Sequence, residues 1–201
     1  MKPLLGIAAT LLALYSYIPY FRDIFAGKTK PHAFSWLVWF LLTAIAFVAQ
    51  VNDNAGAGAW VTGFTALIAL FIFMAAITRG EKNITRSDWL CLVGAFLSMG
   101  LWTITNSPFT AVILITIIDA LGFAPTFRKA FYKPQEETAI TFALSAIKFV
   151  IAIAALTNYT IVTVLYPASL VVMNGLFVAM LMLRRKQLGI SKEKNTEITP
   201  A

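Results

Sequence analysis

Apolar residues occur in seven long runs that short polar segments separate. The runs cover residues 4–21, 33–51, 55–78, 89–105, 109–127, 139–156 and 161–183. A helix needs about 17 to 25 residues to cross the hydrocarbon core of a bilayer, and each run has that length. The pattern therefore predicts an all-α membrane protein with seven transmembrane helices, and it leaves little of the chain for a soluble domain.

One motif occurs twice, 106 residues apart, and it closes the first and the fifth apolar run. It reads PYFRDIF at residues 19–25 and PTFRKAF at residues 125–131. At the same offset Thr10 matches Thr116, and Tyr17 corresponds to Phe123. Internal duplication in a strongly apolar chain is typical of transporters, whose two halves move against each other around a central site.

The repeat predicts how the chain divides. Residues 1–78 form a first three-helix unit, residues 79–107 a connector helix with its loops, and residues 108–186 a second three-helix unit. The polar residues 187–201 are expected to be a disordered tail. Because three is an odd number of crossings, the single connector helix makes the two three-helix bundles parallel.

Composition and charge agree with a membrane location. Hydrophobic residues make up 59% of the chain and charged residues 12%, against about a quarter charged in soluble domains. The net charge is +7, but the basic residues are spread over short loops, which argues against nucleic-acid binding. Most Lys and Arg residues follow the first, third, fifth and seventh runs. The positive-inside rule therefore predicts an outside N-terminus and a cytoplasmic C-terminus, and the short loops favour a bacterial inner membrane.

Tryptophans near the ends of the runs fit an aromatic belt. Trp36 and Trp89 lie at the predicted inner boundary, and Trp60 and Trp102 at the outer one. Trp39 lies about two turns into the second run, where it either lines a cavity or packs.

The repeated prolines, Pro19 and Pro125, are candidate hinges. Proline inside a helix removes one backbone hydrogen bond and clashes with the preceding turn, which leaves a weak point. A static kink would produce the same pattern, but recurrence at equivalent places in both halves favours the hinge. The neighbouring Arg22 and Arg128 are interpreted as anchors at the inner face.

Two charges, Asp119 and Lys148, fall near the middle of their runs. A charge at that depth costs at least about 2.5 to 3.5 kcal/mol, so both side chains are expected to face the protein interior. They could form a mutual salt bridge that fixes packing, or they could form a substrate or proton site. The equivalent positions in the first half are Ala13 and Leu42, so either role belongs to the second half alone.

Helical spacing adds polar residues to the same faces. Thr116 shares a face with Asp119, Ser145 shares one with Lys148, and Thr43 shares one with Trp39. We expect these faces to point inward and to line a site. Stripes of small and hydroxyl residues also serve helix packing in lipid, and that alternative stays open.

The 3+1+3 organisation, the outside N-terminus and the proline near the end of each unit's first helix resemble the SWEET, SemiSWEET and PQ-loop transporters. The resemblance implies a transporter that binds a small polar metabolite between its two units. SWEET-like sites carry an asparagine in the last helix of each unit, and Asn174 fits that role in the second unit. The prolines match the family's motif, but Tyr20 and Thr126 stand where it has Gln or Asn. Nicotinamide-riboside transporters of the Pnu type share the architecture.

Enzymatic functions lack candidate residues. The single histidine lies in a basic loop and the single cysteine in an apolar run, so no metal cluster or activated nucleophile is evident. We therefore expect no cofactor and no enzymatic activity. The expected partners are the lipid bilayer and a small-molecule substrate, and a homo-oligomer stays open. The alternative function is a non-transporting membrane scaffold or sensor.

Overall fold

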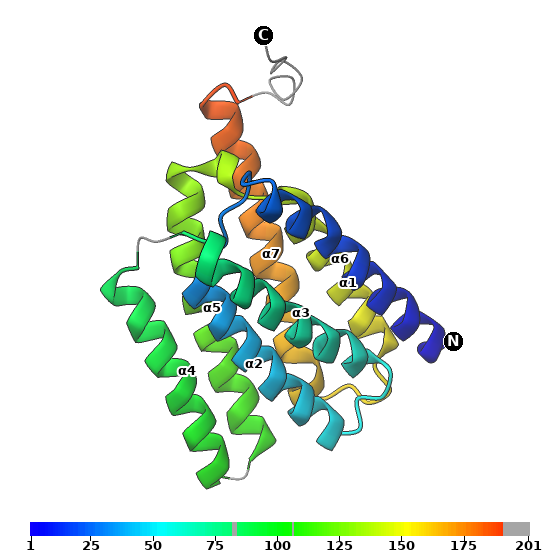
Figure 1. The fold of residues 1–201 in the computed structure, drawn as a ribbon. Helices are drawn as coiled ribbons and strands as arrows, with labels where there is room; N and C mark the ends of the chain where they lie inside the picture. Colours follow the sequence, from blue (N-terminus) through cyan, green and yellow to red (C-terminus); the bar gives the residue numbers. More distant parts are fainter. Residues whose placement is uncertain (82–83, 106, 191–201) are drawn as a thin grey trace.

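The computed structural model describes residues 1–81, 84–105 and 107–190, without the side chains of residues 87, 91, 95, 98, 99, 102 and 103. The described residues form seven α-helices and one short 3-10 helix, and none of them belongs to a β-strand (Figure 1). The elements are α1 (Lys2–Phe25), α2 (Ala33–Asn52), α3 (Gly58–Arg79), α4 (Arg86–Thr105), α5 (Pro108–Tyr132), η1 (Pro134–Glu136), α6 (Ala139–Ala155) and α7 (Ile161–Gln187). The prediction of seven helices is confirmed, and the expected tail lies mostly outside the described residues.

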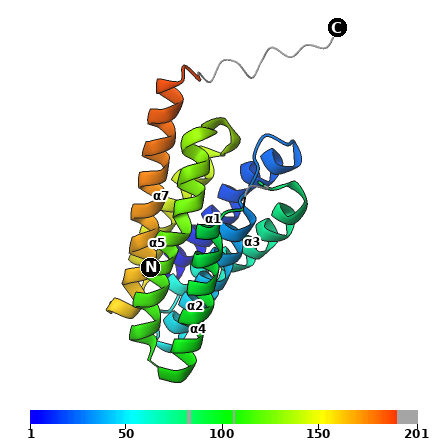
Figure 2. The ribbon, with the colours of Figure 1, turned by 90° about the vertical axis from the view of Figure 1, so that its left-hand side faces the viewer.

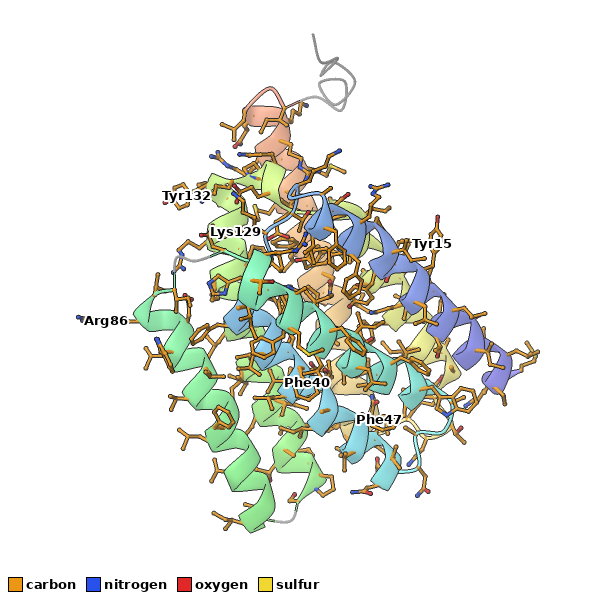
Figure 3. All side chains as sticks on the ribbon, in the orientation of Figure 1. Tyr15, Phe40, Phe47, Arg86, Lys129 and Tyr132 are labelled. Carbon is orange, nitrogen blue, oxygen red and sulfur yellow. The ribbon has the colours of Figure 1, made fainter. Side chains whose placement is uncertain are left out.

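Length and composition suggest a membrane location. Helices α1, α2, α3, α5 and α7 are long and apolar enough to cross a bilayer, and α6 is apolar but shorter. Large apolar side chains cover the outside of the bundle; Tyr15, for example, projects away from α1 (Figure 3). Trp60 and Trp89 are exposed, as a belt requires. Trp36, predicted as an anchor, is instead buried, and the side chain of Trp102 lies outside the described part of the chain.

Helix starts recur at the spacing of the sequence motif. α5 begins 106 residues after α1, and α6 begins 106 residues after α2. Proline near the first position starts both α1 and α5, where its missing N–H removes no helical bond. Side chains cap other starts: His32 accepts a bond from the backbone of Ser35 at α2, and Thr160 and Thr163 form a capping box at α7.

Helix packing follows the same repeat (Figures 1 and 2). α3 packs on both α1 and α2, and α7 packs on both α5 and α6. Between these groups α1 packs on α6, and α2 packs on α5. Exchanging α1–α3 with α5–α7 leaves this set of contacts unchanged. The backbone N–H of Lys30, after α1, donates to the carbonyl of Glu136, after α5, so equivalent helices end at the same end of the bundle.

Helix α4 lies at the edge of the bundle, against α5 and α2 (Figure 1). The carboxylate of its buried Asp88 lies between two basic side chains, 3.3 Å from His32 Nε2 and 3.6 Å from Arg128 Nη2, and it accepts from the backbone N–H of Thr85 at 2.6 Å. Arg128 also donates to Thr85 Oγ1 at 2.9 Å. The arginine of the second motif therefore attaches the start of α4 to α5.

The two prolines lie beside equivalent hydrogen bonds. Ser35 Oγ of α2 donates to the carbonyl of Gly122 at 3.3 Å, and Thr141 Oγ1 of α6 donates to the carbonyl of Ser16 at 2.9 Å. Donors and acceptors are each 106 residues apart, and each acceptor precedes its proline by three residues. The predicted hinges at Pro19 and Pro125 are thus braced by a hydroxyl from the other half.

Close packing at the start of α3 leads to a first prediction. A Cβ on Gly58 would lie 2.6 Å from Leu156 Cδ2 and 2.8 Å from the backbone oxygen of Ala152. Gly58→Ala should lower the free energy of unfolding by about 1 to 3 kcal/mol, because the backbone there cannot yield cheaply. Unfolding in detergent with rising SDS measures the change.

Gly175→Ala is the matched control, because Gly175 lies within α7 and nothing lies within 4 Å of its added Cβ. It should leave stability unchanged or raise it by up to about 1 kcal/mol through better helix propensity. Equal effects of the two substitutions would contradict the packing described for Gly58.

Candidate functional site

A cavity lies at the centre of the bundle, among α1, α2, α3, α5, α6 and α7. Its volume is about 40 Å³, room for a few water molecules and less than a small-molecule site usually offers. Every residue that lines it is less than a tenth exposed. The cavity is therefore shared by both halves of the chain and is enclosed.

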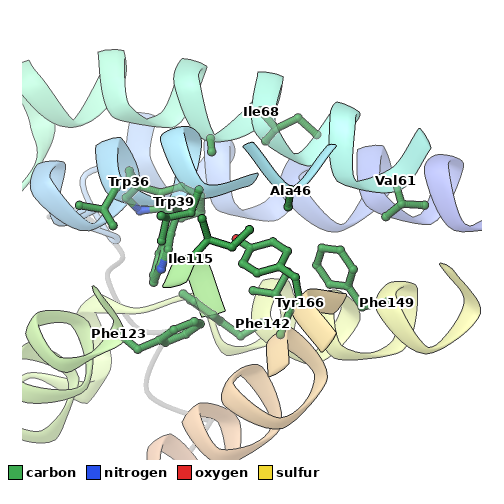
Figure 4. Close-up of a cluster of buried hydrophobic side chains, with 14 of the residues drawn as sticks. Trp36, Trp39, Ala46, Val61, Ile68, Ile115, Phe123, Phe142, Phe149 and Tyr166 are labelled. Atoms are coloured by element: carbon green, nitrogen blue, oxygen red, sulfur yellow. The ribbon is translucent and has the colours of Figure 1, made fainter. Parts of the chain in front are cut away.

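Aromatic side chains form about half of the lining (Figure 4). Trp36 and Trp39 of α2 meet edge to face with ring centres 5.0 Å apart, and Trp39 lies 4.7 Å from the ring of Phe123 on α5. Trp36 Nε1 donates to Tyr20 Oη at 3.2 Å, which fixes its orientation. The remaining aromatic lining comes from Tyr17, Phe142, Phe149 and Tyr166. Flat, rigid walls of this kind suit the apolar faces of a small ligand.

Two buried polar atoms on the cavity lining have no hydrogen-bond partner. One carboxylate oxygen of Asp119 accepts from Tyr166 Oη at 3.3 Å, while the other, Oδ2, accepts nothing. The indole nitrogen of Trp39, Nε1, donates to nothing. An unsatisfied buried polar group costs free energy, and such groups are rare in folded proteins. One free acceptor and one free donor on the lining of one cavity are what a polar ligand would satisfy.

Lys148 lies just behind the cavity wall and is fully buried. Its ammonium donates to Tyr17 Oη and to Thr65 Oγ1, each at 3.1 Å, and both acceptors line the cavity. The ammonium also lies 4.4 Å from the ring centre of Tyr17 and 4.9 Å from that of Phe149. Lys148 and Asp119 do not form the salt bridge considered from the sequence, since each has hydroxyl partners instead.

Of the other predicted site residues, two line the cavity and one does not. Ser145 and Asn174 line the cavity, and the Asn174 side-chain amide donates to the carbonyl of Leu170 at 2.7 Å. Thr116 does not line it: the side chain is half-buried, and its hydroxyl donates to Val112 within α5 at 2.7 Å. Periodicity assigned Thr116 to the inward face, but its position rotates it away from the centre.

Sequence reasoning did not assign Tyr166 and Thr65 to the site, nor Tyr17 as a ligand of Lys148. Tyr17 carried a signal, because it belongs to the repeat that contains Pro19. Tyr166 precedes Pro167 inside α7, a third proline within a helix. Thr65 had no signal in a run of apolar residues, and only its contact with Lys148 identifies it.

The loops that follow α1 and α5 lie together at one end of the bundle, called here the basic end (residues 26–32 and 133–138). Lys129 Nζ and Glu137 Oε1 form a buried ion pair at 2.7 Å. The same ammonium donates to the carbonyls of Lys30 and Glu136. Burial raises the pKa of the Glu137 carboxyl, and the Lys129 ammonium offsets part of this rise. Around the pair, Thr138 bonds Thr29 at 2.6 Å, so the two loops are joined by side chains as well.

The loops that follow α2 and α6 lie together at the opposite end of the bundle (residues 53–57 and 156–160). Thr160 Oγ1 donates to the carboxylate of Asp53 at 2.5 Å, and the amide of Asn158 donates to the Asp53 carbonyl at 3.2 Å. The backbone N–H of Thr157 donates to the carbonyl of Ala55 at 3.0 Å. Both ends of the bundle are therefore joined across the two halves.

Comparison with protein-family models, curated proteins and solved structures finds no match to this chain.

The ion pair at the basic end leads to a second prediction. Glu137→Leu should lower the free energy of unfolding by about 3 to 5 kcal/mol, because it leaves the Lys129 ammonium buried without a counter-ion. The double variant Lys129→Met with Glu137→Leu should recover most of the loss. Denaturant unfolding in detergent measures both.

The matched control is Lys133→Met, which removes a lysine–glutamate ion pair of 3.1 Å to Glu81 in which the lysine is half-exposed. Solvent screens that pair, so its removal should change stability little. A double variant as unstable as Glu137→Leu alone would show that the unpaired charge is not the cause.

Proposed function

We propose that this chain is a membrane transporter that moves a small polar metabolite by alternating access. In this proposal α1–α3 and α5–α7 are two parallel three-helix bundles joined by the connector α4. The recurrence of helix starts and the exchangeable contacts between the two groups support this division. The basic end is assigned to the cytoplasm by its lysines and arginines, which puts the N-terminus outside.

The observation that carries the proposal is the enclosed cavity with its two unpartnered polar atoms, Trp39 Nε1 and Asp119 Oδ2. A metabolite with one hydrogen-bond acceptor and one donor satisfies both atoms. The aromatic walls contact the rest of the ligand, and Asn174 and Ser145 add polar contacts along α7 and α6. Asn174 also occupies the helix in which SWEET-like transporters carry their asparagine, whereas Ile68 stands at the equivalent place in α3.

Transport requires that the two ends of the bundle open in turn. Opening the basic end separates the loops that Lys129 and Glu137 join, and opening the opposite end separates Asp53 from Thr160. Pro19 and Pro125 are the proposed hinges, because proline weakens the helix at the level where the halves are hydrogen-bonded. Charged groups hold the loops of the basic end together, and mostly neutral groups hold those of the opposite end. The two ends therefore differ in the free energy needed to open them.

A membrane scaffold or sensor is the rival function. Such a protein has no need for an internal cavity, and packing normally fills the interior and pairs its polar groups. The unpaired donor and acceptor on the lining of one cavity favour a ligand-binding protein over a scaffold.

Uptake into proteoliposomes tests the proposal. Purified protein is reconstituted and offered a panel of labelled sugars, vitamins and amino acids, and at least one should enter faster than into protein-free vesicles. Asp119→Asn and Trp39→Phe should each lower uptake of that compound about threefold to tenfold at low concentration, because each removes one hydrogen bond to the ligand. Both substitutions nearly conserve side-chain shape.

Trp60→Phe is the matched control for Trp39→Phe, because Trp60 is exposed on the outside of α3. It should leave uptake unchanged. Uptake that persists at the native rate in both site variants would remove the cavity from the mechanism, and no entry of any compound would count against transport.

A further inference from the structure

The buried ammonium of Lys148 connects the two halves of the bundle. It belongs to α6 and donates to Tyr17 of α1 and Thr65 of α3, each at 3.1 Å. Both acceptors line the central cavity, so the ammonium holds two helices of the first half against one of the second. The apolar Leu42 stands at the equivalent position in α2, so the first half has no lysine that corresponds to Lys148.

The charge of Lys148 has no counter-ion in the described part of the chain. No described carboxylate lies within 4.0 Å of its nitrogen, and neutral oxygens and aromatic faces surround it instead. The helices packed on α6 are α1, α3 and α7. Among their cavity-lining residues the titratable groups are Tyr17 of α1 and Tyr166 of α7, and Tyr166 donates to Asp119 on α5. A lysine side chain can lose its proton when it is buried, whereas an arginine side chain keeps its charge.

Resting on the transport function proposed above, we propose that Lys148 is the proton carrier of the cycle, so that the chain moves protons together with its substrate. In its charged form it donates to Tyr17 and Thr65 and holds the cavity closed. When water reaches the cavity from one side, Lys–NH3⁺ gives one proton to that water and becomes Lys–NH2. The neutral amine loses its attraction to the aromatic faces and donates more weakly, so α1 and α3 are released from α6.

Opening of the cavity, measured without any substrate, tests this inference separately from transport. A reporter cysteine replaces Ser145, which lines the cavity one turn before Lys148, in a background in which Cys91 is serine. The rate of alkylation by a water-soluble methanethiosulfonate is measured in detergent from about pH 6 to about pH 9. Lys148→Arg supplies the comparison, because a guanidinium keeps its charge at these pH values.

With Lys148 present, the alkylation rate should rise with pH at least about tenfold more than in the Lys148→Arg variant, because the thiol and the other ionisable groups are the same in both proteins. Thr65→Val removes one acceptor of the charged form, so its rise should shift to lower pH, while Thr65→Ser should keep the native profile. Lys186→Met, an exposed lysine at the end of α7, should also keep it.

The same pH profile in the native and Lys148→Arg proteins would overturn the proposal. If Lys148→Arg does not fold, the comparison of Thr65→Val with Thr65→Ser decides alone. Equal pH profiles of the alkylation rate in these two variants would overturn the proposal. A positive result together with failed uptake of every compound would reject the transport assignment and leave the proton-linked opening in place.

Discussion

Hydrogen bonds between the two halves of the bundle are the constraint on which the rest of the structure depends. A polar side chain inside an apolar bundle needs a hydrogen-bond partner, either a carbonyl of its own helix or a group on another helix. Ser35 and Thr141 use another helix, since each donates to the carbonyl three residues before a proline. Each proline-containing helix is therefore bonded to the other half next to its proline.

Against this symmetric framework, the charges are asymmetric. Asp119 and Lys148 belong to the second half, and Ala13 and Leu42 stand at the equivalent positions of the first. Each charge nevertheless contacts more than its own helix: Asp119 bonds Tyr166 of α7, and Lys148 bonds α1 and α3. The two charges at mid-helix depth thus both belong to the second half, and one oxygen of Asp119 on the cavity lining has no hydrogen-bond partner.

The helices and their approximate ends could be predicted because length and hydropathy are local properties of the chain. The spacing of 106 residues was visible in the motif at Pro19 and Pro125, and the starts of α5 and α6 recur at the same spacing. The candidate site residues came from three kinds of signal: depth within an apolar run for Asp119 and Trp39, helical spacing for Ser145, and the family resemblance for Asn174. All four line the cavity.

What the sequence by itself determined is the number of helices, their repeat and the depth of each polar residue, because these follow from the order of side chains along a helix. Tertiary structure alone decided which polar groups meet. It separated Lys148 from Asp119, rotated Thr116 out of the cavity and brought Thr65 to the lysine, because the rotation of each helix depends on its packing against helices far away in the chain. The depth of a residue depends on its own helix alone, whereas its hydrogen-bond partner depends on how two helices pack.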